Sequence, residues 1–196
     1  MRIGIARMQT TELTAKSIKE TFSDAGIDSF YLKNNSQITM ADLIIVLGGD
    51  RGVRNYFHRS LDVDTPVLGV SESESSGFLS QIELRDLSSY LNRIKKQDYV
   101  IENAPRIGVK IDAKKAYPVL NDVAIFSSKS ATLMEHVLRV NGEEIWHDNS
   151  DGVIISTPIG SSAYSMSAGG PVIFQGANVF GIISVNSLDT TRRPLI

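Results

Sequence analysis

The segment over residues 151–171, DGVIISTPIGSSAYSMSAGGP, has the composition and spacing with the clearest chemical meaning in this chain. Fourteen of its 21 residues are Gly, Ser, Thr, Pro or Ala. Small residues let backbone N–H groups approach a ligand closely, and hydroxyls add donors and acceptors. The apolar run 153–155 predicts a buried strand, followed by a loop over 156–162 and a short helix over 163–168, which Ser161 or Ser162 would cap. This arrangement suits a polar, anionic, nucleotide-like ligand, and the alternative is a plain glycine- and serine-rich turn.

A second group, Gly48-Gly49-Asp50, follows the apolar run 42–47. Ligands of open α/β sheets bind at the carboxyl ends of the strands. Two glycines can expose backbone N–H groups there, and the start of a following helix adds a positive dipole end. Asp50 could accept a proton from a hydroxyl or hold Mg²⁺, and phosphoryl transfer uses both. The alternative is that Asp50 only caps the helix after a tight turn.

A third group, Asn121-Asp122, precedes the apolar run 123–126. Two polar side chains at the start of a strand can bind a ribose or an amide, although Asn-Asp also favours a simple β-turn. The histidines at positions 58, 136 and 147 have no spacing typical of metal ligands, and the chain has no cysteine. We therefore expect no metal site made of histidine or thiolate ligands.

Composition narrows the class of protein. The 196 residues carry a net charge of −2, which gives no electrostatic basis for binding nucleic acid or an anionic membrane. The longest apolar runs are far shorter than the ~20 residues of a membrane helix, and the first residues are too polar for a signal peptide. We expect a soluble, cytoplasmic protein without nucleic-acid or membrane partners.

The elements that must position these groups change character near residue 98. Before it, strands alternate with amphipathic helices, which predicts a Rossmann-like α/β domain over 1–98 with a parallel sheet. After it, strands separated by turn signals at Asn141-Gly142 and Asp148-Asn149 predict an all-β sandwich over 99–196. The expected strands are 2–6, 28–32, 42–47, 66–70, 99–101, 106–111, 119–126, 133–140, 144–146, 153–156 and 179–185, and the expected longer helices are 12–25, 52–60 and 84–96.

Taken in order, the three groups resemble the NAD kinase family, whose pattern is a GGDG turn, an Asn-Glu pair and a DG…STPTGSTAYS-SAGGP block. Here the pattern reads Gly48-Gly49-Asp50-Arg51, Asn121-Asp122 and residues 151–171. The segments PVLGVSESESSGFLSQI (66–82) and NSLDTTRRPL (186–195) are also similar to family segments. Lipid kinases and phosphofructokinases carry related GGD turns, but the serine-glycine block argues against them.

The resemblance implies a kinase that phosphorylates the 2′-hydroxyl of the adenosine ribose of NAD, giving NADP. The donor would be ATP or polyphosphate with Mg²⁺ or another divalent cation. Asp50 would be the catalytic carboxylate in a donor-binding domain, with Gly48, Gly49 and Arg51 near the donor phosphates. NAD would contact Gly49, Asp50, Asn121, Asp122, Asp151, Ser162, Ala163, Tyr164 and Ser167, most of them in the second domain. Family members usually form dimers or tetramers, so we expect a homodimer or homotetramer.

Several positions depart from the family pattern. Arg51 replaces the last glycine of GGDG, where glycine permits a positive φ. Arg51 could instead bind phosphate through its guanidinium, and Gly52 is the candidate to take over the flexible position. Two functions therefore stay open: an active NAD kinase, and a catalytically impaired NAD(P)-binding homologue acting as a sensor or regulatory subunit. The sequence also stops in an expected strand, so we expect a second domain that is truncated or completed by a partner chain.

Overall fold

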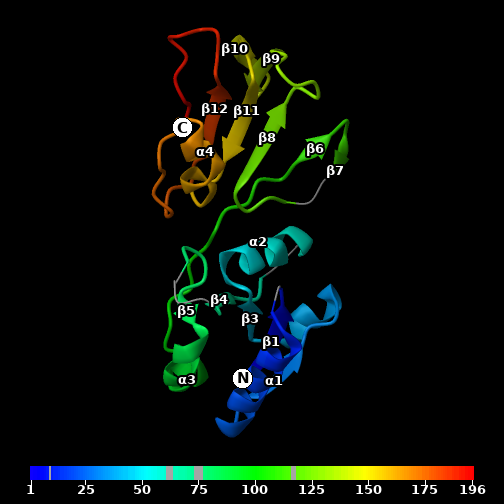
Figure 1. The fold of residues 1–196 in the computed structure, drawn as a ribbon, viewed down its shortest axis with the longest axis vertical. Helices are drawn as coiled ribbons and strands as arrows, with labels where there is room; N and C mark the ends of the chain where they lie inside the picture. Colours follow the sequence, from blue (N-terminus) through cyan, green and yellow to red (C-terminus); the bar gives the residue numbers. More distant parts are fainter. Residues whose placement is uncertain (9, 61–63, 73–76, 116–117) are drawn as a thin grey trace. The chain divides into compact units, whose positions relative to one another are not determined.

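The computed structural model describes residues 1–8, 10–60, 64–72, 77–115 and 118–196, and this part of the chain forms two compact units (Figure 1). Unit 1 is Met1–Glu102 and unit 2 is Asn103–Ile196. Unit 1 is an α/β unit around a parallel sheet, and the sheets of unit 2 are antiparallel. The predicted fold class, a parallel α/β domain followed by an all-β domain, is confirmed.

The sheet of unit 1 has the strand order β2-β1-β3-β4-β5, and every pairing is parallel. Its central strand β3 is buried along its whole length, as expected for a strand covered on both faces. The strands are β1 (Arg2–Arg7), β2 (Asp28–Tyr31), β3 (Leu43–Leu47), β4 (Val67–Ser71) and β5 (Ile82–Glu83).

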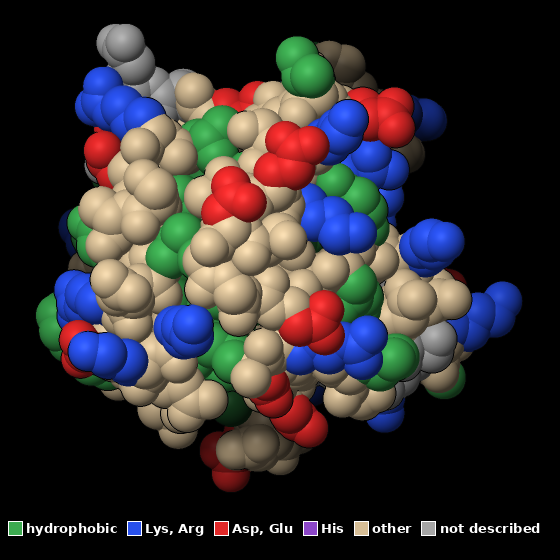
Figure 2. All heavy atoms as spheres, turned by 90° about the horizontal axis from the view of Figure 1, so that it is seen from below, with side chains coloured by type: hydrophobic (Ala, Val, Ile, Leu, Met, Phe, Trp, Pro, Cys, Tyr) green, Lys and Arg blue, Asp and Glu red, His purple; other side chains and the backbone are tan. Residues whose placement is uncertain are grey.

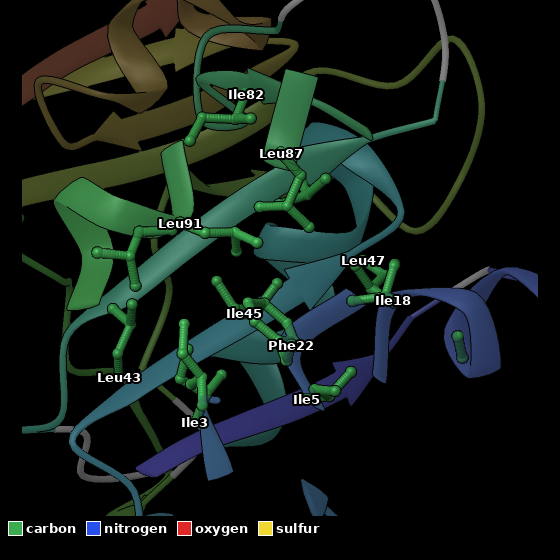
Figure 3. Close-up of a cluster of buried hydrophobic side chains, with 14 residues drawn as sticks. Ile3, Ile5, Ile18, Phe22, Leu43, Ile45, Leu47, Ile82, Leu87 and Leu91 are labelled. Carbon is green, nitrogen blue, oxygen red and sulfur yellow. The ribbon is translucent and has the colours of Figure 1, made fainter. Parts of the chain in front are cut away.

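Helices cover both faces of this sheet. On one face α1 and α3 pack against the odd-numbered residues of β1 and β3, and the labelled side chains of Figure 3 converge there. On the other face α2 packs against Ala6, Ile44 and Val46. The helices are α1 (Glu12–Asp24), α2 (Gly49–Arg59) and α3 (Leu87–Lys95), with 3-10 helices at Asn35–Met40 and Leu84–Asp86.

Helix α2 begins at Gly49, three residues before the predicted start. The reason is local, because Gly48 (φ 117°) and Gly49 (φ 62°) both adopt left-handed conformations and turn the chain from β3 directly into the helix. A Cβ on Gly48 would lie 2.3 Å from the carbonyl oxygen of Met8, so only glycine fits at this position. The early start places Asp50 inside the first turn of α2.

Unit 2 contains a three-stranded antiparallel sheet, β12-β11-β8, and two hairpins, β9-β10 and β6-β7. In the larger sheet Ser156 pairs with Asp122 at one end, and Gly152 pairs with Phe126 at the other. The strands are β6 (Lys110–Ile111), β7 (Lys114–Lys115), β8 (Asp122–Phe126), β9 (Met134–Val140), β10 (Glu143–Ser150), β11 (Gly152–Ser156) and β12 (Gly181–Val185). A 3-10 helix, η3 (Gly160–Ser162), leads into the short helix α4 (Tyr164–Ser167).

Two local predictions are wrong. Asp148-Asn149 is not a turn but lies inside β10, where Trp146, Asp148 and Ser150 are buried and the residues between them are exposed. The strand expected over 99–101 is not formed, and these residues, near the end of unit 1, belong to no helix or strand. The Asn141-Gly142 turn is confirmed, with φ values of 55° and 89° that suit a tight hairpin.

Charge is mixed on the surface. On the face drawn in Figure 2, Lys and Arg side chains are interspersed with Asp and Glu side chains, in agreement with the net charge of −2. None of the helices in the described residues combines the length and apolarity that a bilayer-spanning helix needs.

Candidate functional site

Asp50 is held by a turn that follows the neighbouring strand β4. Its Oδ1 accepts hydrogen bonds from Leu79 N (2.9 Å), Ser80 N (2.8 Å) and Ser80 Oγ (2.8 Å), and its Oδ2 accepts one from Phe78 N (2.8 Å). The N-cap of α2 is Gly48, which makes no side-chain hydrogen bond. Asp50 therefore does not cap its own helix; its carboxylate binds the turn over 77–80 instead.

These contacts fix the charge of Asp50. Burial raises the pKa of its carboxyl, but the hydrogen bonds from the Ser80 hydroxyl and from the amides of Ser80, Leu79 and Phe78 lower it by more. The net pKa lies below the usual value for aspartate. Asp50 is therefore an ionised, oriented carboxylate at neutral pH, at the carboxyl end of a parallel strand.

Arg51 is the third residue of α2 and its side chain is exposed. It needs no positive φ, because Gly48 and Gly49 already provide the left-handed residues of this turn. The expectation that Gly52 takes over the flexible glycine position of the turn is wrong. Gly52 is buried within the helix, and a Cβ there would lie 2.8 Å from the carbonyl oxygen of Leu47. Arg51, in place of the glycine of the family pattern, therefore adds a charge without straining the backbone.

In unit 2, the loop after β11 is tied to the start of β8. Thr157 N donates to Asn121 O (2.8 Å), Thr157 Oγ1 donates to Leu120 O (2.6 Å), and Gly160 N donates back to Thr157 Oγ1 (3.0 Å). A Cβ on Gly160 would lie 2.0 Å from Asn121 O. The small residues of this block thus serve first to bring the loop against Asn121.

The same contacts gather several of the predicted NAD-binding residues at one end of the sheet. Asn121 and Asp122 lie there with the η3 turn, which ends at Ser162, and Ala163 follows it. Among the described residues, the side-chain oxygen Oδ1 of Asn121 is buried without a hydrogen-bond partner. A buried acceptor without a donor is costly, so this oxygen is suited to a donor from a polar ligand or a water.

The predicted capping of α4 by a serine is wrong. Ser161 Oγ donates to Pro158 O (2.6 Å) and accepts from Ile173 N (2.8 Å), and Ser162 Oγ donates to Ile159 O (3.2 Å). The N-cap of α4 is Ala163, and the helix is only four residues long. The serine hydroxyls therefore stabilise the turn itself, and α4 is too short to act as an anion site.

Asp151 belongs to the other end of β11, whereas Tyr164 directly follows Ala163 at the start of α4. Asp151 precedes the strand by one residue, about 17 Å from Ser156 at about 3.4 Å per residue, and accepts from Asn186 Nδ2 (2.7 Å). The Tyr164 ring stacks on Phe126, with centroids 5.9 Å apart and an interplanar angle of 20°. Both rings are partly exposed, and Ser167 is exposed on α4. Unit 2 alone therefore does not bring all the predicted NAD-binding residues together.

Neither the turn over 77–80 nor Phe126 has a functional role that the residue types and spacing alone predict. The letters GFLS (77–80) lie in a segment similar to a family segment, and nothing in them indicates a hydrogen bond to Asp50. In the described residues, no three His, Cys, Asp or Glu side chains are grouped so that they could hold a metal ion.

Comparisons with known proteins match both units. Residues 4–99 match the family model described as the ATP-NAD kinase N-terminal domain, and residues 120–196 match the ATP-NAD kinase C-terminal domain. The NAD kinase of Clostridium perfringens is 35% identical over 175 residues, which are 87% of this chain and 62% of that protein. The NAD kinase of Legionella pneumophila is 35% identical over 159 residues, which are 79% and 54% of the two chains. This chain thus spans less than two thirds of the length of these relatives.

Two solved structures share the fold. An NAD kinase from Archaeoglobus fulgidus in complex with ATP has a TM-score of 0.82 at 24% identity, covering 100% of this chain and 76% of that one. A yeast NADH kinase complexed with NADH has a TM-score of 0.76 at 18% identity, covering 100% and 68%. At these identities the likeness concerns the fold of the backbone.

Proposed function

Since the chain belongs to the NAD kinase family, we propose that it transfers a phosphoryl group from ATP or polyphosphate to the 2′-hydroxyl of the adenosine ribose of NAD, giving NADP. The observation that supports this most is the Asp50 carboxylate, held ionised by four hydrogen bonds at the carboxyl end of β3. Phosphoryl transfer depends mainly on positioning and charge, which an oriented carboxylate supplies.

In the proposed reaction, Asp50 orients the 2′-hydroxyl and receives its proton. The 2′-oxygen forms a bond to the terminal phosphorus as the bond to the leaving phosphate oxygen breaks. With a pKa below the usual value, Asp50 is a weak base. It therefore acts chiefly by orienting the hydroxyl, and it takes the proton late, when the 2′-oxygen has lost most of its basicity to the new bond.

The donor phosphates are assigned to the start of α2. The backbone of Gly48 and Gly49 and the positive end of the helix favour anions, and the exposed guanidinium of Arg51 adds a bidentate donor. The carboxylates of the described residues do not fit a protein-held Mg²⁺ site, because these residues hold no acidic cluster and Asp50 Oδ1 already accepts three hydrogen bonds. Mg²⁺ or another divalent cation is expected to enter bound to the donor phosphates.

The dinucleotide is assigned mainly to unit 2. Asn121 and Asp122 offer polar atoms for the ribose, and the exposed ring of Tyr164 offers a stacking surface for a planar base. The remaining proposed NAD contacts are Gly49, Asp50, Asp151, Ser162, Ala163 and Ser167.

An assay of NADP formation tests the proposal. The full chain is incubated with NAD or NADH, Mg²⁺, and ATP or polyphosphate, and Asp50→Asn is compared with Asp24→Asn, an exposed aspartate at the end of α1. We expect turnover in the wild type and in Asp24→Asn, and a loss of about 10²- to 10⁴-fold in Asp50→Asn with NAD binding retained. NAD binding by the wild type without turnover, with either donor, would rule out the kinase.

The second candidate function is an NAD(P)-binding sensor or regulatory subunit. The observation that favours it is Arg51, a fixed positive charge beside Asp50 where the family pattern has glycine. Arg51→Gly separates the two functions. A large gain in NADP formation in this variant would indicate that the arginine suppresses catalysis, whereas a weaker affinity for the donor would indicate that it binds phosphate.

We also propose a cytoplasmic protein that assembles as a homodimer or homotetramer. Light scattering on the purified full chain measures the assembly, and a monomer at micromolar concentration would overturn that part of the proposal.

A further inference from the structure

The turn over 77–80 is built around one carboxylate. Gly77 N donates to Ser80 O (3.1 Å), which closes the turn, and the next three amides all point at Asp50. Ser80 is the one residue of the turn whose side chain also takes part, and it is 1% exposed. A Cβ on Gly77 would lie 2.0 Å from Asp50 Oδ1, so the carboxylate occupies the space that a larger residue would fill.

The two carboxylate oxygens of Asp50 accept different numbers of hydrogen bonds. Oδ1 accepts three hydrogen bonds, two of them from Ser80, and a carboxylate oxygen has about two lone pairs. Oδ2 accepts one hydrogen bond, from Phe78 N, and keeps a lone pair. The carboxylate thus has one occupied oxygen and one that is available to a further donor.

We propose that Ser80 is a positioning residue, whose buried hydroxyl, bonded to Oδ1 of Asp50, holds the carboxylate in the orientation in which Oδ2 receives the substrate hydroxyl. This inference rests on the proposed kinase function. Without the Ser80 hydroxyl, Oδ1 keeps its two amide donors but loses its side-chain donor, which comes from a buried residue. The carboxylate then has more freedom to rotate, and Oδ2 is less often aligned with the substrate hydroxyl for transfer.

Kinetics of Ser80→Ala in the full chain test the inference, with Ser89→Ala, at an exposed position of α3, as a control that also loses one serine hydrogen bond. We expect kcat to fall about tenfold or more in Ser80→Ala. The KM values for NAD and donor should change by less than about threefold, because neither the NAD residues nor the donor residues are altered. Ser80→Thr, which keeps the hydroxyl, should recover most of kcat. An unchanged kcat in Ser80→Ala, or a loss equal to that in Ser89→Ala, overturns the inference.

A second measurement does not depend on turnover. The carboxyl carbon of Asp50, labelled with ¹³C and assigned by its loss in Asp50→Asn, is titrated by NMR in wild type and Ser80→Ala. Removing a hydrogen bond to the charged form should raise the pKa of this carboxyl, and an unchanged titration overturns the inference. If Ser80→Ala does not fold, Ser80→Cys, a weaker donor, replaces it in both measurements. Absence of NADP formation in the wild type would count against the proposed function, while the titration still decides whether Ser80 controls Asp50.

Discussion

Replacing Asp148 with alanine should destabilise unit 2, because this carboxylate is the centre of a buried polar group. Asp148 is 4% exposed and accepts hydrogen bonds from Ser184 Oγ (2.6 Å), Ser187 Oγ (2.7 Å) and Asn149 N (2.8 Å). The Nε of Arg192 lies 3.4 Å from its Oδ2. The group joins β10 to β12 and to the segment that follows β12, so its loss weakens tertiary structure and not only one turn.

The expected loss is about 3 kcal/mol. A hydrogen bond to a charged group contributes roughly 1.5–3 kcal/mol, and removing one partner of a buried ion pair costs roughly 3–5 kcal/mol. The contributions are not additive. The Arg192 side chain is 21% exposed, so water solvates part of its guanidinium once Asp148 is removed. These two corrections bring the estimate to the lower end of the range for a buried pair.

Urea unfolding followed by Trp146 fluorescence measures this loss directly. Trp146 is the chain's single tryptophan, is 6% exposed, and packs under Arg192, whose guanidinium carbon is 5.0 Å from its ring centroid. With a slope of about 1.5 kcal/mol per M, 3 kcal/mol lowers the midpoint by about 2 M. Asp189→Ala removes the exposed partner of Arg192 and should leave the midpoint nearly unchanged. A midpoint within about 0.3 M of wild type in Asp148→Ala would show that the buried group contributes little.

Three further predictions concern the same unit. Thr157→Val removes two buried hydrogen bonds and should cost about 2 kcal/mol by the same fluorescence assay. Gly160→Ala forces a methyl group against the Asn121 carbonyl and should weaken NAD binding about tenfold or more by calorimetry, whereas Gly108→Ala, with open space around it, should not. Hydrogen bonds and Arg192 lower the pKa of Asp148 by more than burial raises it, so its contribution to stability is complete above the unfolded value of about 4 and is lost as the pH falls through the folded pKa. The urea concentration at the midpoint should therefore fall as the pH is lowered below about 4, and it should fall less steeply in Asp148→Ala.

The sequence predicts those features that follow from local pattern. The run Leu43–Leu47 is apolar at every position, and it is a central parallel strand buried on both faces. Asn141-Gly142 needs positive φ at both residues, and it forms the β9-β10 turn. In each case the information lies within a few residues, so propensity and periodicity are sufficient.

The role of Asp148-Asn149 could not be predicted in this way. Its composition favours a turn, but burial alternates along β10, and Asp148 is stabilised inside the unit by serines 36 and 39 residues away. Tertiary hydrogen bonds override a local preference here, and no window of the sequence contains both partners.

The same limit applies to Asp50, whose donors lie 28 to 30 residues further along the chain. The sequence identifies the carboxylate but neither its charge state nor which oxygen is available. Arg51 is the opposite case. The sequence pattern suggested that a residue other than glycine would strain the backbone here, but Gly48 and Gly49 already supply the left-handed conformations of the turn. What remains of the substitution is a positive charge in the first turn of α2, where the helix dipole is also positive. Both charges attract phosphate and both oppose a cation. If Arg51 affects the reaction, it should therefore act through the affinity for the donor and its bound metal, and the geometry of Asp50 should stay as it is.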